Sequence, residues 1–153
     1  MITNKEQYKN AVKGYKVLLK TIEKWKEKAE KNPEKISIKM QYDAFKGQLP
    51  EIEKEIKEYK DLTSGNIISI TTDSINELPE AIVKYRIMNK VSYKELAKKI
   101  GVSEKEIRDW EIGFAANSYR KASLERVIQI LDALDGKITI RFEKDNSLDD
   151  KVK

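Results

Sequence analysis

The chain has 153 residues, of which 39% are hydrophobic and 37% charged, and 31 basic side chains against 26 acidic ones give a net charge of +5. It contains neither cysteine nor histidine, which excludes disulfides, thiolate or imidazole zinc sites, cysteine nucleophiles and histidine general bases. The sequence also lacks an eighteen-residue apolar run, the apolar stretch of a signal peptide and a glycine-rich phosphate loop, so we expect a cytoplasmic protein that is not an enzyme and uses no cofactor, metal or membrane.

A long amphipathic helix is predicted at the N-terminus. Thr3 and Glu6 have the spacing of a capping box, in which each side chain satisfies a free backbone donor. Apolar side chains then recur every three or four residues from Tyr8 to Ala29, which predicts a helix of roughly 28 residues. Asn32-Pro33 is expected to end it.

A second apolar stripe runs through residues 45–63 and predicts another helix. Pro50 lies inside this stripe, so a kink or a break is expected there, and the unbroken phase of the stripe favours a kink. A short connection makes residues 1–65 an antiparallel helical hairpin. Since each helix has a single apolar stripe, we expect this hairpin to bury more apolar surface on another copy in dimerisation, on another domain or on a partner protein.

The excess positive charge belongs to the same segment. Residues 1–65 carry 15 basic and 11 acidic side chains, a difference of +4. Mixed charge of this kind favours a solvated helical surface.

Two β-branched stretches predict short strands. Residues 66–72 read NIISITT, within a linker that spans 66–77. Residues 137–142 read KITIRF, in which apolar and polar side chains alternate, and they begin a C-terminal region, 137–153, whose polar end is expected to fray. Because one strand alone is unstable, the two could pair with each other.

Two nearly identical phrases stand eleven residues apart, VSYKEL at 91–96 and VSEKEI at 102–107. In each phrase a serine is followed three residues later by glutamate, which is the pattern of a capping box at the start of a helix. The predicted helices cover residues 92–100 and 103–112, and Gly101 allows a sharp turn between them. Two short helices joined in this way are typical of a helix-turn-helix, whose second helix enters a DNA major groove.

Flanking helices complete a unit at residues 78–136. The preceding helix begins near Leu78 and accepts Pro79 in its first turn. Ser123 is the expected cap of a following helix, which Asp135-Gly136 ends. Four or five short helices in this span are enough to enclose a core.

The stretch ELAKKIGVSEKEIRDWEIG resembles the signature of the lambda-repressor/Cro-like, or Xre, helix-turn-helix family. The resemblance covers about residues 75–135, and the whole layout is similar to antitoxins of the HigA type, which place a helical hairpin before this domain. It implies a mainly all-α fold, with the N-terminal hairpin followed by a four-to-five-helix lambda-repressor-like domain. The motif is carried by Leu96-Ala97, Gly101-Val102-Ser103, Ile107, Trp110-Glu111 and Gly113.

The same resemblance implies which side chains face DNA. The second helix carries four acidic residues against two basic ones, and we expect Glu106 and Glu111 to have structural uses, the first in a cap and the second as an anchor to neighbouring helices. Many members of the family have glutamine where Tyr93 stands. The implied base contacts are Glu104, Lys105, Arg108 and Asp109. The implied phosphate contacts are Ser92, Tyr93, Ser103, Asn117, Ser118, Tyr119, Arg120 and Lys121.

The resemblance implies a sequence-specific DNA-binding transcriptional regulator that acts as a homodimer on a double-stranded, palindromic operator. An autoregulating type II antitoxin with a cognate toxin as partner is the favoured form. Two alternatives stay open, a prophage-type or housekeeping repressor, and a protein-interaction module that has the same fold but no affinity for DNA.

Overall fold

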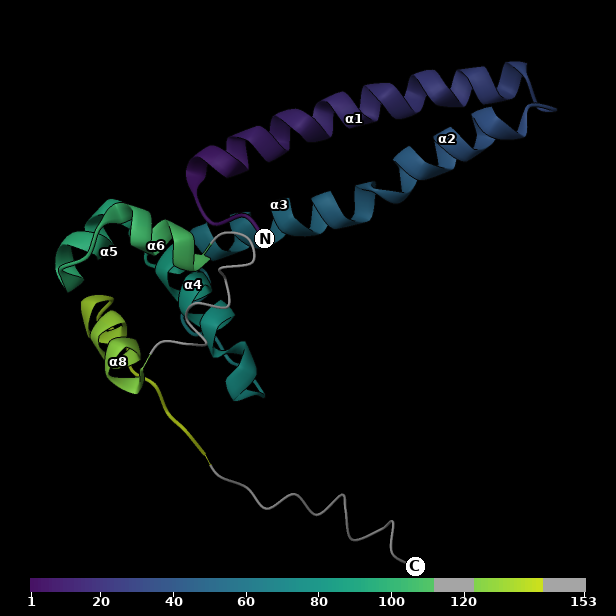
Figure 1. The fold of residues 1–153 in the computed structure, drawn as a ribbon. Helices are drawn as coiled ribbons and strands as arrows, with labels where there is room; N and C mark the ends of the chain where they lie inside the picture. The colour runs from purple at the N-terminus through teal and green to yellow at the C-terminus, as the bar shows by residue number, and fades with distance from the viewer. Residues whose placement is uncertain (112–122, 142–153) are drawn as a thin grey trace, which may run out of the picture.

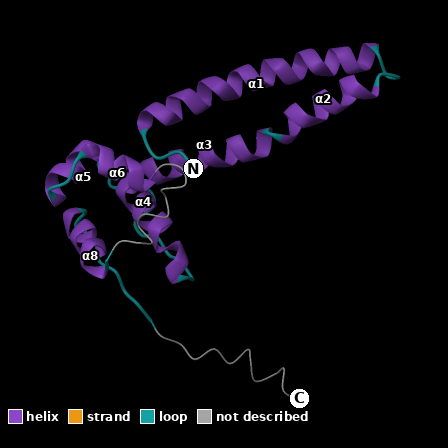
Figure 2. Ribbon diagram, viewed as in Figure 1, coloured by secondary structure: helices purple, strands orange, loops and turns teal. Residues whose placement is uncertain are grey.

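The computed structural model describes residues 1–111 and 123–141, and this part of the chain is helical without a strand (Figures 1 and 2). The predicted all-α class is therefore confirmed. The α-helices are α1 (Lys5–Lys31), α2 (Ile36–Gly47), α3 (Leu49–Thr63), α4 (Leu78–Met88), α5 (Tyr93–Ile100), α6 (Glu104–Glu111) and α8 (Leu124–Ala133), and a 3₁₀ turn (Ile75–Glu77) precedes α4.

Helix α1 runs antiparallel to α2 and α3 and forms the long hairpin seen in Figure 1. Aromatic pairs join the two arms near both ends. The rings of Tyr8 and Tyr59 stack with their centroids 5.0 Å apart, and those of Trp25 and Phe45 lie 6.1 Å apart. The apolar stripes of the two arms thus face each other, as amphipathic spacing requires.

The second arm is interrupted at Gln48, which separates α2 from α3 and places Pro50 in the first turn of α3. Proline has no N–H to donate, so it interrupts the hydrogen bonds of a helix interior. In the first turn of a helix the N–H groups have no partner within the helix, so Pro50 is tolerated there. Gln48 keeps right-handed helical angles (φ −80°, ψ −19°), so α2 and α3 continue in similar directions (Figure 1). The sequence favours a kink at Pro50, but the structure has a break at Gln48 after which the helix axis changes direction little.

The N-terminal cap differs from the prediction by one residue. Asn4, not Thr3, is the N-cap of α1, and its side-chain oxygen accepts a hydrogen bond from the backbone N–H of Gln7 at 2.9 Å. Glu6 has no capping role, and the Thr3 hydroxyl instead meets the hydroxyl of Tyr93 in α5. A contact distant in sequence has displaced the local capping box.

The hydrophobic core lies among α3, α4, α5, α6 and α8. Because Leu62 near the end of α3 is 3% exposed and belongs to this core, the hairpin is packed onto the C-terminal helices. Leu96, Ile107 and Ile130 are completely buried at its centre. The other buried members are Ile82, Val83, Ile87, Tyr93, Ala97, Val127 and Leu134.

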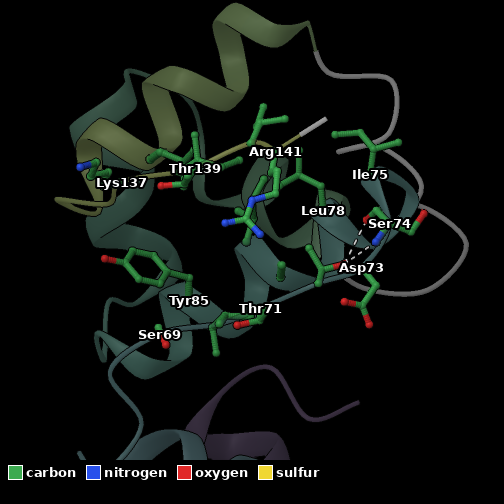
Figure 3. A pocket seen from close by; sticks show the side chains of 17 residues that line it. Ser69, Thr71, Asp73, Ser74, Ile75, Leu78, Tyr85, Lys137, Thr139 and Arg141 are labelled. Carbon is green, nitrogen blue, oxygen red and sulfur yellow. Dashed lines mark hydrogen bonds between the residues drawn. The ribbon is translucent and has the colours of Figure 1, made fainter. Parts of the chain in front are cut away.

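The predicted strands at 66–72 and 137–142 are wrong for the described residues, and residue 142 lies outside them. No backbone hydrogen bond joins 66–72 to 137–141. Instead both segments line a groove of about 850 Å³ (Figure 3). Leu78, Ile82 and Tyr85 of α4 line the same groove. Ile67 and Ile70 pack against the hydrophobic core, whereas Ile68 is 88% exposed.

Candidate nucleic-acid interface

The turn between α5 and α6 is made by Gly101. Its backbone is left-handed (φ 72°, ψ 35°), and its N–H donates to the carbonyl of Ala97. The N–H of Val102 reaches the same carbonyl at 3.0 Å, which closes the end of α5. Most side chains are strained at such angles. The predicted sharp corner at Gly101 is confirmed.

Both predicted capping boxes are present. Glu95 accepts from the backbone N–H of Ser92 at 2.8 Å, while the Ser92 hydroxyl accepts from the N–H of Glu95 at 3.2 Å. Ser103 and Glu106 repeat this arrangement with the same two distances. Hydrogen bonds from the backbone and then the hydroxyl of each serine lower the pKa of its glutamate partner. These bonds fix where α5 and α6 begin, within one residue of the prediction.

Helix α6 buries one face and exposes the other. Ile107 is fully buried, while the four residues with predicted base contacts are exposed: Glu104, Lys105, Arg108 and Asp109. Arg108 Nη2 lies 3.0 Å from Glu104 Oε1, one turn back along the helix. Lys105 forms no ion pair with another described residue. The exposed charges of α6 are therefore the ion pair, the separate cation of Lys105, and the carboxylates of Asp109 and of Glu106, which is bound to Ser103.

The far end of α6 is held by Arg86 of α4, a residue that the sequence analysis missed. Its guanidinium donates from Nε to Glu111 Oε1 at 2.7 Å, from Nη1 to the carbonyl of Val91 at 2.7 Å, and from Nη2 to the carbonyl of Thr3 at 2.8 Å. Arg86 is 3% exposed and Glu111 4%. The predicted anchoring role of Glu111 is confirmed. A signal was available, because Arg86 follows the buried Ile82 by one helical turn and shares its face.

Tyr93, a predicted phosphate contact, has a buried side chain. The side chain is 7% exposed, its ring lies 4.6 Å below the guanidinium of Arg86, and its hydroxyl meets Thr3. A side chain enclosed in this way does not face solvent, so a phosphate contact at Tyr93 stays a prediction for its backbone N–H at the start of α5. The side chain is enclosed because Tyr93 joins the hairpin to the C-terminal helices.

The remaining predicted phosphate contacts divide into two groups. Ser92 and Ser103 are exposed at the N-termini of α5 and α6, where backbone N–H groups attract anions. The others lie outside the described residues: Asn117, Ser118, Tyr119, Arg120 and Lys121.

The described residues include no group of three or more acidic side chains placed to hold a metal ion. Among the described helices, none combines the length and the apolar character needed to cross a bilayer.

A comparison with known protein families supports a helix-turn-helix in this part of the chain. No curated protein and no solved structure matches the chain. Residues 82–140 match the model of the Helix-turn-helix family, of the Cro/C1 type. This span contains both capped helices, the Gly101 turn and α8. Residues 82–140 are thus similar to a Cro/C1-type helix-turn-helix domain, and this similarity supports a DNA-binding transcription regulator.

Proposed function

We propose that this protein is a sequence-specific repressor that inserts α6 into the major groove of an operator. The observation that carries the proposal is the left-handed turn at Gly101, which leaves the start of α6 exposed while Ile107 is buried. Lys105 and Arg108 are then the proposed readers of guanine, and Glu104 and Asp109 the acceptors for a cytosine amino group. Ser92 and Ser103 mark the helix N-termini that contact phosphates.

The ion pair between Arg108 and Glu104 does not prevent this role. Both side chains are about half exposed, at 55% and 44%, and an exposed pair of this kind is worth about 0–1 kcal/mol. A bidentate contact from arginine to guanine contributes about 1–3 kcal/mol of discrimination. Arg108 therefore gains by leaving Glu104 for a guanine, and the freed carboxylate can accept from a neighbouring cytosine.

We propose a homodimer on a palindromic operator, with half-sites roughly 34 Å apart. Helix α8 supports this, because Leu124 and Ile128 are 70% and 47% exposed and lie one helical turn apart. Exposed apolar side chains on one face favour contact with another protein surface. The proposed phosphate contacts outside the described residues stay part of this proposal: Asn117, Ser118, Tyr119, Arg120 and Lys121.

An autoregulating antitoxin is the proposed biological form, with the hairpin of residues 1–65 holding a toxin or the second subunit. Its support is the likeness of the layout to HigA-type antitoxins. This form predicts a small toxic gene beside this one, and rescue of growth when both are expressed together. A neighbouring gene without toxicity would leave a prophage-type or housekeeping repressor.

The direct test measures binding of a duplex from upstream of the protein's own gene, against a random duplex of equal length. The upstream duplex should bind more tightly, and Arg108→Ala should weaken that binding by about 1–3 kcal/mol and relax preference at one base position. Lys98→Ala is the matched control, because Lys98 is an exposed cation on α5 outside the proposed interface.

Equal binding of both duplexes, together with no effect of the double change Lys105→Ala/Arg108→Ala, would favour a protein-interaction module instead.

A further inference from the structure

A line of lysines runs along the outer side of α1. Lys9, Lys13, Lys16 and Lys20 follow one another at steps of four, three and four residues. At about 100° per residue they fall within about 60° of the helix circumference. All four are exposed, and none forms an ion pair with a described residue.

Acidic residues are absent from residues 7–22, although α1 is otherwise mixed in charge. Helix α3 shows the ordinary arrangement, in which bases and acids alternate. Its lysines are Lys54, Lys57 and Lys60, and its acids are Glu51, Glu53, Glu55, Glu58 and Asp61. A solvated surface needs only such a mixture. An unmatched row of four cations repels itself, and an anionic partner relieves that repulsion.

The lysine line begins beside the helix-turn-helix. Thr3, two residues before α1 starts, contacts Tyr93, the first residue of α5. Lys9 follows the N-cap Asn4 by five residues, a rise of about 8 Å, and Lys20 lies about 16 Å farther along the axis. The row thus starts close to the N-terminus of α5, where the proposed function places a phosphate.

The hairpin is attached firmly enough to hold this row in place. Arg86 binds the carbonyl of Thr3 and the carboxylate of Glu111 at once, and Leu62 packs in the core. The start of α1 and the end of α6 therefore keep a fixed relation. The lysine line can contact DNA if a duplex docked on α6 runs past the start of α1, which lies beside Tyr93 at the start of α5.

We propose that this lysine line is a second DNA contact, which binds the phosphate backbone beyond the footprint of the helix-turn-helix. The inference rests on the proposed function, because α6 sets the position of the duplex. Phosphate contacts add affinity without reading sequence. The hairpin would thus lengthen the bound stretch of DNA and strengthen binding to every duplex alike.

The test compares two triple variants of equal charge change, Lys9→Gln/Lys13→Gln/Lys16→Gln on α1 and Lys54→Gln/Lys57→Gln/Lys60→Gln on α3. Glutamine has nearly the helix propensity of lysine, and circular dichroism checks that both variants fold. Binding to the upstream duplex and to a random duplex is measured at salt concentrations from about 50 to 200 mM, over which counterion release strongly changes DNA affinity.

The α1 variant should lower the slope of log affinity against log salt by about 2 to 3, since each lost phosphate contact removes about 0.9. Its affinities for the two duplexes should fall by the same factor, so that their ratio is unchanged. The α3 variant should leave the slope as in the wild type. An unchanged slope in the α1 variant, or equal losses in both variants, overturns the inference.

The outcomes also separate this inference from the proposed function. If the wild type binds both duplexes equally and the α1 variant still lowers the slope, the sequence-specific repressor fails while the lysine contact stands. If the wild type binds neither duplex, both proposals fail.

Discussion

Arg86 of α4 and Glu111 at the end of α6 form a buried ion pair, with side chains that are 3% and 0% exposed. The guanidinium meets the carboxylate through two nitrogens, in the geometry that makes arginine–carboxylate pairs specific. A buried pair of this kind fixes orientation more reliably than it adds net stability. This pair thus adds an anchor at the end of α6, whose middle is held in the core by Ile107.

Removing only one member of this ion pair should strongly destabilise the protein. Arg86→Met leaves the Glu111 carboxylate buried without its cation, and we expect the free energy of unfolding to fall by about 3–5 kcal/mol. The double change Arg86→Met/Glu111→Leu should recover much of that loss, because neither charge is then buried. Urea unfolding of the three proteins measures both effects. A double variant that is no more stable than the single one would contradict this account.

The hydroxyl pair between Thr3 and Tyr93 should couple the hairpin to the C-terminal helices. Tyr93→Phe should lower the free energy of unfolding by about 0.5–1.5 kcal/mol, since Thr3 keeps its bond to Gln7. Thr3→Val removes both bonds of that hydroxyl and should have a larger effect. In the double variant the loss should be smaller than the sum of the two single losses, as a double-mutant cycle would measure. Strict additivity would show that the two hydroxyls do not interact.

Substitution by alanine should have opposite effects on stability at two glycines. Neither Gly101 nor Gly14 has an atom within 4 Å of where a Cβ would lie, but only Gly101 of the two has a positive φ. Gly101→Ala should therefore destabilise by about 1–2 kcal/mol through backbone strain alone. Gly14→Ala, inside α1, should stabilise by about 0.5–1 kcal/mol. Thermal unfolding of the two variants gives the comparison, and a loss in both would mean that Gly14 has a packing role.

The capping glutamates should make stability depend on pH in acid. The pKa of Glu95 and that of Glu106 are lowered from the ordinary 4.5 by hydrogen bonds to their serine partners. A lowered pKa in the folded state means that this stabilisation is complete above pH 4.5 and is lost as the pH falls through the lowered values. Unfolding midpoints between neutral pH and the acid range measure the loss.

Ser103→Ala supplies the control for that measurement. It removes one of the bonds to Glu106, so the pKa of this carboxyl, followed by NMR, should rise toward 4.5 while that of Glu95 stays where it was. An unchanged pKa of Glu106 would show that the serine hydroxyl does not contribute.

The sequence predicts best those features that depend on neighbouring residues. Ser92, Gly101 and Ser103 set the ends of α5 and α6 through hydrogen bonds spanning three to five positions, so their pattern can be read directly. Pro50 predicts an interruption of the second helical arm, and the structure has one there. Whether that interruption is a kink or a break depends on the backbone at Gln48, which the sequence pattern does not determine.

The errors arise where distant residues compete for a group. Thr3 fits a capping box by spacing, but Tyr93, ninety positions away, takes its hydroxyl. The stretch 66–72 has the composition of a strand, yet a strand also needs a partner, and composition does not reveal that Ile67 and Ile70 pack against the helical core instead. Arg86 was overlooked for the same reason, since its carboxylate partner lies 25 positions farther on.

The bond from Arg86 to the carbonyl of Thr3 spans 83 positions, and this has a consequence for the order of assembly. On the ribosome the first residues emerge long before Arg86 and Glu111 have been made. The α1 hairpin can close early, since its arms are neighbours in the chain, but its attachment through Thr3 must wait for α4, α5 and α6. A nascent chain would therefore carry a folded hairpin before the helices that hold it have been made.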